Sequence, residues 1–169
     1  MKLRQALPAD AKAIGEVRVA AWQAAYPAFM PAAYLAGLDP SANLEALESR
    51  LAAPPDRFSF TVAEVDGALV AFSILGAPRH DSSAAGLELW ALNVLPAFWR
   101  QGLGRSLIRQ AKAAAKQLQV DRLELWCIEG NAPAQAAYES CGFVRTGQQR
   151  TSSLLTGYAL HEALYAIAL

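Results

Sequence analysis

The segment from residue 87 to residue 128 constrains the fold more than any other part of the chain. Its first stretch, "LELWALNV" (87–94), is apolar on both sets of alternating positions, which is typical of a central strand covered on both faces. A helical pattern begins near Leu103, and "RLELWCI" (122–128) predicts the next strand. Two strands joined by a helical crossover lie parallel to each other in one sheet. The segment is therefore expected to form a βαβ unit.

The rest of the chain predicts further elements on both sides of that unit. Asp66-Gly67 is a strong hairpin signal between two β-rich runs. A polar loop is expected at 76–86, and no repeat or linker divides the chain, so we expect a single domain over residues 1–169. The pattern indicates a mixed α/β fold. Further strands are expected at 2–6, 58–65, 69–75, 143–150 and 158–169. Further helices are expected at 8–25, in a region that ends before residue 53, and within 132–141.

Charge and cysteine content exclude several classes of partner. Fifteen basic residues balance fifteen acidic ones, whereas proteins that bind nucleic acids or membrane surfaces usually carry a basic excess. The longest mainly apolar run, 68–77, is too short to cross a bilayer, and the N-terminal residues lack the apolar core of a signal peptide. Cys127 and Cys141 lack the spacing of a zinc site. We therefore expect a cytoplasmic protein with reduced thiols, no metal, no nucleic-acid partner and no membrane partner.

The loop "VLPAFWRQGLGRSL" (94–107) places two glycines and two arginines where the strand ends and the helix begins. A helix N-terminus already carries a partial positive charge, so Arg100 and Arg105 are unfavourable there unless an anion lies among them. Gly102 and Gly104 let the backbone approach such an anion and direct unpaired N–H groups at it. A phosphate or pyrophosphate fits this loop. The alternative is a plain strand-to-helix turn with surface arginines.

Two known phosphate-binding motifs do not match this loop. The Walker loop requires a lysine followed by Ser or Thr, a pair that does not occur here. A dinucleotide-binding fingerprint has a third glycine where this chain has Leu107, although Glu124 stands at a suitable distance for a ribose-binding acid. A nucleotide-binding protein therefore stays as a weaker alternative.

Two motifs closely resemble the signatures of the Gcn5-related N-acetyltransferase (GNAT) superfamily. "LNVLPAFWRQGLGRSLI" contains the first signature, Q/R-x-x-G-x-G/A, with Trp99 at the position of the usual Gln or Arg. "GNAPAQAAYESCGF" (130–143) contains the second, an Asn followed by a helix that ends in Tyr-x-x-x-Gly-Phe. The order of elements also matches along essentially the whole chain. The resemblance implies a GNAT-like acyl-CoA N-acyltransferase fold, with a central, mostly antiparallel sheet of about seven strands and flanking helices.

The resemblance also implies an activity, the transfer of the acetyl group of acetyl-CoA to a primary amine by direct attack in a ternary complex. The amine would belong to a small molecule or a peptide, and homodimers are common in the family. A non-catalytic acyl-CoA-binding or sensor domain of the same fold is the chief alternative. The resemblance places the cosubstrate against the backbone of Leu92, Asn93 and Val94, against Asn131, and against a pyrophosphate-binding segment made of Arg100, Gln101, Gly102, Leu103, Gly104 and Arg105.

Acetyl transfer needs a proton donor for the leaving thiolate, and the resemblance assigns this role to Tyr138. A phenol, with an ordinary pKa of about 10, can donate to a developing thiolate. A packed helix aromatic is the alternative for this residue. Some family members carry a catalytic glutamate where this chain has Trp126, so the candidate general base is Glu88, in an otherwise apolar strand. Two alternatives are open, a carboxylate at the exposed start of the strand that pairs with Arg79 or solvent, and a water-relayed deprotonation. Glu88 shares strand parity with Leu92 and Val94 unless a bulge intervenes.

The first long helix supplies the candidate acceptor pocket. Arg18, Trp22 and Tyr26 recur every four residues and so share one helix face. The resemblance places the end of this helix over the acceptor site, with Trp90 nearby, so Trp22, Tyr26 and Trp90 are the expected pocket residues. Packing of these aromatics in the core is the alternative.

Overall fold

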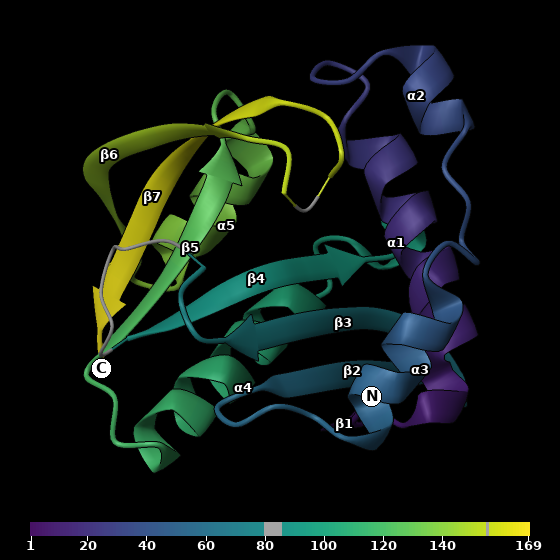
Figure 1. Cartoon of the computed structure of the whole chain (residues 1–169). Coiled ribbons are helices and arrows are strands. Elements are labelled where there is room, and N and C mark those ends of the chain that lie inside the picture. Colours follow the sequence, from purple (N-terminus) through teal and green to yellow (C-terminus); the bar gives the residue numbers. More distant parts are fainter. Residues whose placement is uncertain (80–85, 155) are drawn as a thin grey trace.

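One seven-stranded sheet forms the centre of the fold, with the strand order β1-β2-β3-β4-β5-β7-β6. The computed structural model describes residues 1–79, 86–154 and 156–169, so the middle of the loop expected at 76–86 lies outside the described residues. Every pair of neighbouring strands is antiparallel except β4 with β5, as a mostly antiparallel fold of the GNAT kind requires. The strands, shown in Figure 1, are β1 (Lys2–Gln5), β2 (Ser59–Val65), β3 (Ala68–Gly76), β4 (Leu87–Val94), β5 (Arg122–Ile128), β6 (Val144–Ser152) and β7 (Leu160–Ala168).

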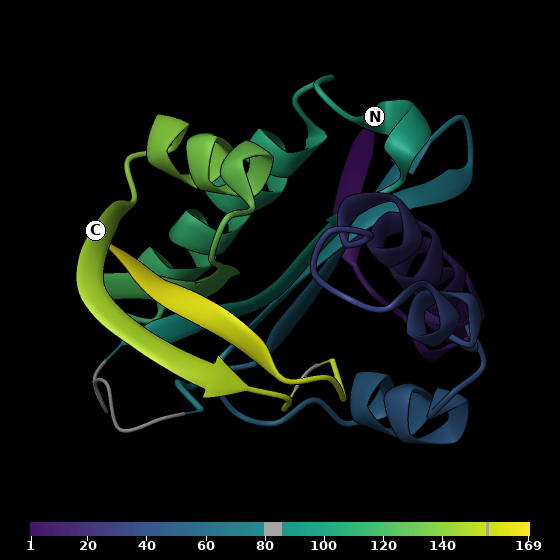
Figure 2. The ribbon, with the colours of Figure 1, turned by 90° about the horizontal axis from the view of Figure 1, so that it is seen from above.

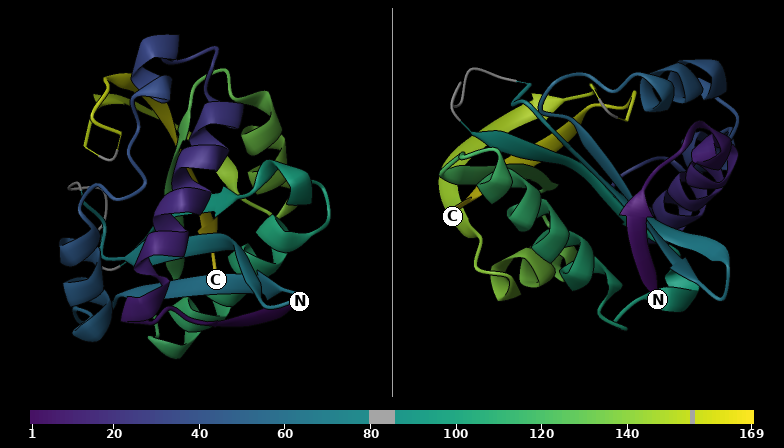
Figure 3. Two further views of the ribbon diagram at one scale, coloured as in Figure 1. Left: turned by 90° about the vertical axis from the view of Figure 1, so that its right-hand side faces the viewer. Right: turned by 90° about the horizontal axis from the view of Figure 1, so that it is seen from below.

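Helices cover both faces of this sheet. In Figures 2 and 3, α4 and α5 lie on one face, while α1 and α3 lie on the other. The predicted helix 8–25 is a 3-10 turn (Pro8–Asp10) that runs into α1, and the region before 53 is two short helices rather than one. The helices are α1 (Ala11–Ala25), α2 (Ala32–Ala36), α3 (Leu44–Ala52), α4 (Leu103–Gln117) and α5 (Ala132–Ser140).

The predicted hairpin between β2 and β3 is confirmed. Val65 pairs with Ala68, and the two residues between them both have positive φ, 51° at Asp66 and 80° at Gly67. A two-residue turn with this backbone matches the right-handed twist of the strands that it joins. The Asp-Gly turn therefore sets the register at the start of the β2–β3 hairpin, before the shift between Ala63 and Glu64.

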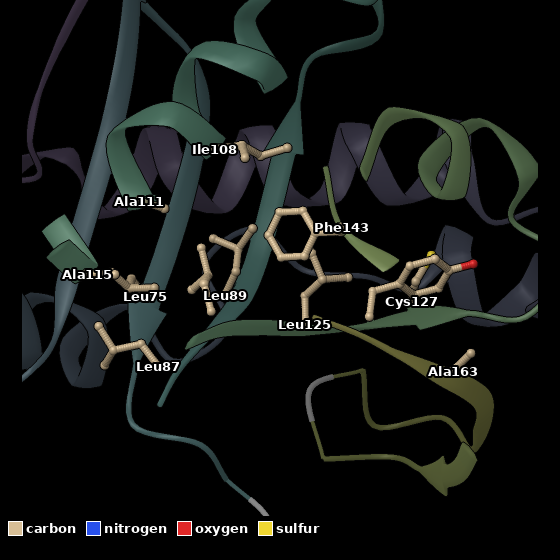
Figure 4. Packing of buried hydrophobic residues seen from close by; sticks show 12 residues of the cluster. Leu75, Leu87, Leu89, Ile108, Ala111, Ala115, Leu125, Cys127, Phe143 and Ala163 are labelled. Atoms are coloured by element: carbon tan, nitrogen blue, oxygen red, sulfur yellow. The ribbon is translucent and has the colours of Figure 1, made fainter. Parts of the chain in front are cut away.

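The larger hydrophobic core lies between the sheet and the α4–α5 face. Figure 4 shows Leu89, Ile108, Leu125 and Phe143 packed together, from β4, α4, β5 and the segment before β6. Each leucine of this core is almost fully buried, which contributes roughly 1.5–3 kcal/mol per side chain. This core fixes α4 and α5 against β4 and β5, the elements that carry both sequence signatures.

A β-bulge at Trp90 changes the direction of the side chains along β4. Ile74 of β3 pairs with Ala91 and Leu75 pairs with Leu89, so Trp90 is an extra residue in β4. Leu89 and, beyond the bulge, Leu92 and Val94 pack on the α4 face, whereas Ala91 packs in the cluster under α1. The bulge therefore separates Glu88 from Leu92, which a regular strand would place on the same face.

Candidate active site

The candidate site is built around the point where β4 and β5 stop pairing. The two parallel strands pair only over Leu87–Glu88 with Leu123–Glu124, and Figure 1 shows them diverging beyond these residues. β5 keeps its partner β7 along its whole length, and β4 keeps β3. The sheet is therefore open between its two central strands, at their C-terminal ends.

The backbone of β4 offers hydrogen-bonding groups to this opening. Leu95 N–H donates to Val70 O of β3 at 2.9 Å, so successive residues of β4 face β3 and β5 in turn. The backbone groups of Leu92 and Val94 face the open side, whereas those of Asn93 face β3. Backbone donors and acceptors need partners. An extended ligand with amide groups can supply these partners, as expected for the pantetheine arm.

The loop before α4 has the strained backbone of a binding turn. Arg100 has φ of 60° and Gly102, the residue that precedes α4, has φ of 86°. The first intrahelical bond is donated by Ser106 N–H to Gly102 O, which leaves the preceding N–H groups of the helix free of intrahelical partners. No acidic residue lies in the first turn, and Arg100 and Arg105 are exposed. The structure thus presents an unneutralised, cationic helix N-terminus beside the end of β4.

The contacts of Trp99 account for a tryptophan at the position where the first signature usually has Gln or Arg. Its indole Nε1 donates a hydrogen bond of 2.7 Å to the backbone oxygen of Val94, while 42% of the residue is exposed. Gln101 is fixed in the same loop through a 2.9 Å bond from its side chain to Ala97 O. Trp99 therefore ties the loop to β4 through an N–H donor and leaves the N–H of Val94 facing the open side.

Tyr138 lies on α5, half-buried against the larger core. Its ring contacts Phe143 edge-on, with centroids 6.1 Å apart and an interplanar angle of 68°. Burial, reinforced by the nearby Cys127, Tyr26 and Cys141, raises the pKa of this phenol well above its usual value. A raised pKa leaves the hydroxyl protonated but makes it a weaker acid than a free phenol.

Asn131 begins α5 and has a structural task of its own. Its side-chain oxygen accepts a hydrogen bond from Ala134 N–H at 3.4 Å and so caps the helix. Gly130, directly before it, has φ of 81°. Asn131 therefore positions α5, and with it Tyr138, in addition to any contact with a ligand.

Glu88 is buried and paired with Arg79, so the expected burial and the expected partner are both found, whereas an exposed start of the strand is not. Only 1% of the residue is exposed, and its carboxylate accepts from the Arg79 backbone N–H at 2.9 Å and from the Arg79 guanidinium, through Nε at 3.1 Å and through Nη2. The guanidinium in turn lies over the Trp90 ring, 5.0 Å from its centroid. Three donors of Arg79 thus hold this carboxylate in place.

The expected acceptor residues fall into two groups. Trp22 and Tyr26 lie at the end of α1 with ring centroids 5.8 Å apart, and Trp22 Nε1 donates to the Asn93 side chain at 3.1 Å. Trp90 instead packs on Phe58 at 5.6 Å, and its Nε1 donates to Ala77 O at 3.0 Å. The structure thus brings Trp22 and Tyr26 together beside β4, whereas the described contacts of Trp90 lie around β3.

A buried ion pair close to the end of β5 was not anticipated from the sequence. Arg150 Nε of β6 donates to Glu162 Oε2 of β7 at 2.7 Å, and the guanidinium lies over the Trp126 ring at 4.1 Å from its centroid. The available signal was the one that identified Glu88, a single acid inside an otherwise apolar strand. In "LHEALYAIAL" that acid is Glu162.

The remaining titratable groups near β5 favour no other chemistry. Burial, together with the negative charges of Glu162 and Glu139, raises the pKa of the Cys127 thiol to about 12, so a reactive thiolate is not available there. Within the described ranges, no group of three or more His, Cys, Asp or Glu side chains could hold a metal ion. No helix in these ranges is long and apolar enough to span a membrane.

The sequence places the chain in the Acetyltransferase (GNAT) family, whose model matches residues 20–143. This match includes both signatures and the elements that carry the candidate site. The chain therefore belongs to the GNAT family and is an acetyl-CoA-dependent N-acetyltransferase.

Relatives and solved structures agree with this assignment. The chain is 27% identical over 129 residues to the uncharacterized N-acetyltransferase YuaI of Bacillus subtilis, covering 76% of this chain and 72% of that protein. The structure of PaiA N-acetyltransferase of Thermoplasma acidophilum, solved with coenzyme A, matches with a TM-score of 0.78 at 17% identity. The match covers 99% of this chain and 98% of the PaiA chain. YncA of Salmonella typhimurium, solved with its cofactor acetyl-CoA, has a TM-score of 0.73 at 22% identity, with coverage of 100% and 94%.

Proposed function

We propose that this enzyme transfers the acetyl group of acetyl-CoA to a primary amine by direct attack in a ternary complex formed between β4 and β5. The observation that carries the proposal is the divergence of these strands next to the free N–H groups at the start of α4. A gap between the two central strands would let the cosubstrate and the amine approach from different faces of the sheet. Such an arrangement favours direct transfer over a covalent acetyl-enzyme.

The backbone would hold acetyl-CoA in two places. Its pantetheine arm would pair with Leu92 and Val94, whose backbone groups face the open side. Its pyrophosphate would accept hydrogen bonds from the N–H groups between Arg100 and Arg105, where the helix dipole favours an anion. Asn131 would meet the arm at the start of α5. Asn93 would act only by holding Leu92 and Val94 in place, because its own side-chain oxygen accepts a hydrogen bond from Trp22 Nε1.

Tyr138 would act as the general acid. Transfer breaks the bond between the acetyl carbon and sulfur, and the departing thiolate needs a proton. A phenol is protonated at neutral pH, so the Tyr138 hydroxyl can donate to the thiolate when the site is filled. The N–H of Val94 is the candidate donor for the negative charge that develops on the acetyl oxygen.

The general base has two candidates. Glu88 remains a prediction, and its carboxylate is held by Arg79 in the structure. Deprotonation of the amine through water is the alternative. A Glu88→Gln variant separates the two: loss of kcat without a change in the KM for acetyl-CoA supports the base, and loss of stability alone assigns Glu88 to the ion pair. The contact with Arg79 predicts the second result.

Release of the CoA thiol from acetyl-CoA in the presence of pooled primary amines tests the proposed function. We expect one or more pools of small amines or peptides to stimulate release, and mass spectrometry of that pool to show one acetylated amine. Acetyl-CoA binding without stimulated release by any pool would favour the alternative, a non-catalytic acyl-CoA-binding domain. The occupied carboxylate of Glu88 is the observation that keeps this alternative in view.

A further inference from the structure

The Arg150–Glu162 pair lies on the face of the sheet from which the amine would approach. Glu162 pairs in register with Ile128, the last residue of β5, and paired residues of antiparallel strands point to the same face. Ile128 belongs to the apolar cluster that includes Trp22 and Tyr26. The neighbouring Cys127 belongs instead to the core on the opposite face, against which Tyr138 packs. The end of β5 therefore separates the proposed acid from the Arg150–Glu162 pair.

Several contacts hold this pair in one geometry. Only 9% of Glu162 is exposed, and its Oε2 atom accepts from Arg150 Nε at 2.7 Å. The guanidinium is stacked on Trp126, 4.1 Å from the ring centroid. Glu162 is also close enough to Tyr26 to contribute, after burial, to a rise in the pKa of that phenol to about 12. The carboxylate thus stands between Arg150 and the aromatic end of α1.

The pair is incompletely satisfied. Arg150 Nη1 is buried, and no described residue accepts a hydrogen bond from it. A buried donor without a partner costs about 1–3 kcal/mol, and burying the two charges costs more. An apolar pair would be at least as stable in this place. Stability alone therefore does not account for the pair.

We propose that Arg150 and Glu162 recognise the acceptor, and that the acceptor is an α-amine with a carbonyl or carboxylate oxygen next to it, as in an amino acid or a peptide N-terminus. The free carboxylate oxygen of Glu162 accepts from the incoming ammonium group. Arg150 Nη1 donates to the neighbouring oxygen of the same ligand. Trp126, Trp22 and Tyr26 provide apolar surface around the two contacts. This inference rests on the proposed function and names the substrate class of that site.

A comparison of three amines tests the substrate class. Trialanine presents an α-amine beside a carbonyl oxygen, propylamine lacks the oxygen, and Nα-acetyl-lysine amide presents a side-chain amine. One hydrogen bond to a charged group contributes about 1.5–3 kcal/mol, so kcat/KM should be about tenfold or more higher for trialanine than for the other two. Equal or better use of propylamine or the lysine side chain would overturn the inference and leave the proposed function standing. If none of the amines were acetylated, both the inference and the proposed function would be overturned.

Two variants assign the effect to the pair. Glu162→Gln keeps an oxygen for Arg150 but removes the charge, and Arg150→Lys keeps the charge but removes the fork and its free Nη1. Each should raise the KM for trialanine by about tenfold or more and leave the KM for acetyl-CoA unchanged. Glu64→Gln is the matched control, because Glu64 pairs with Arg4 at the opposite edge of the sheet. An unchanged KM for trialanine in folded Glu162→Gln and Arg150→Lys proteins would overturn the proposal.

Discussion

Tyr138 can be tested by the removal of a single oxygen atom. In Tyr138→Phe the ring still packs on Phe143, but the leaving thiolate loses its proton donor. We expect kcat to fall by about 10²-fold or more while acetyl-CoA binding is retained. Steady-state release of the CoA thiol, with binding measured by calorimetry, gives both values.

Tyr165→Phe provides the matched control for this substitution. Tyr165 is 2% exposed in the core cluster against which Tyr138 packs, so it loses the same hydroxyl from the same surroundings. Its kcat should stay at the level of the unsubstituted enzyme. If Tyr138→Phe also kept full turnover, the residue would be a packed helix aromatic and not the acid.

Asn131 combines a helix cap with a proposed contact to acetyl-CoA, and two variants separate these roles. Asn131→Ala removes both and should lower the free energy of unfolding by about 1 kcal/mol. Asn131→Ser keeps a capping oxygen, so its stability should stay close to that of the unsubstituted enzyme. A raised KM for acetyl-CoA in Asn131→Ser, measured beside its thermal midpoint, supports the contact. An unchanged KM would restrict Asn131 to the cap.

At the scale of elements, the start of α4 allows the two glycines of the first signature to be tested separately. A Cβ at Gly102 would meet nothing within 4 Å, but its φ of 86° is unfavourable for other residues, so Gly102→Ala should lower stability by roughly 1–2 kcal/mol. A Cβ at Gly104 would lie 3.6 Å from Leu92 Cδ2, an ordinary contact. Gly104→Ala should therefore leave the thermal midpoint unchanged or higher.

The informative measurement on these variants is the KM for acetyl-CoA. Gly104→Ala should leave it unchanged, because the first signature admits Gly or Ala at this position and the added Cβ would lie beside Leu92. Gly102→Ala should raise it, because the φ of 86° at Gly102 directs the N–H groups that would meet the pyrophosphate. An unchanged KM for acetyl-CoA in folded Gly102→Ala protein would contradict the proposed contact at this turn.

The elements were predictable from the sequence where local signals were strong. The Asp66-Gly67 turn, the strand at 87–94 and the helix after the two glycines are all confirmed. The bulge at Trp90 was not predictable, because a bulge adds one residue without breaking an apolar run. The Arg79–Glu88 pair was among the alternatives that the sequence left open. The Arg150–Glu162 pair depends on strand register and on side-chain direction, which a single sequence does not specify.

At the scale of the whole molecule, buried acidic groups predict that stability falls at high pH. Burial raises the pKa of Cys127 from 9.0 and that of Tyr26 from 10.0, in each case to about 12. The unfolded chain therefore loses these protons at lower pH than the folded chain. The contribution of these two groups to the free energy of unfolding is fully present below about pH 9 and should be lost between about pH 9 and 12.

Urea unfolding at several pH values checks this decline. One such group changes the free energy by at most about 1.4 kcal/mol per pH unit. Cys127→Ala should remove the earliest part of the decline, because the thiol has the lowest pKa in the unfolded chain. An identical pH dependence in Cys127→Ala and the unsubstituted protein would contradict this assignment.

The oligomeric state is a second prediction for the whole molecule. The family resemblance favours a homodimer through the last strands, and β6 lies at an edge of the sheet with Val144 68% exposed. Light scattering after size-exclusion chromatography should give twice the mass of the chain. A Val144→Lys variant should shift this mass to that of a monomer, and a monomer already in the unsubstituted protein would refute the dimer.

A crystal structure of the complex with acetyl-CoA tests the central claim most directly. We predict that the pantetheine arm lies between β4 and β5, paired with the backbone of Leu92 and Val94, and that the pyrophosphate contacts the turn at Gly102–Arg105. Sulfur should then lie within hydrogen-bonding reach of the Tyr138 hydroxyl. Acetyl-CoA bound elsewhere, for example in the cavity of about 330 Å³ between α1, α3 and the sheet, would contradict the account.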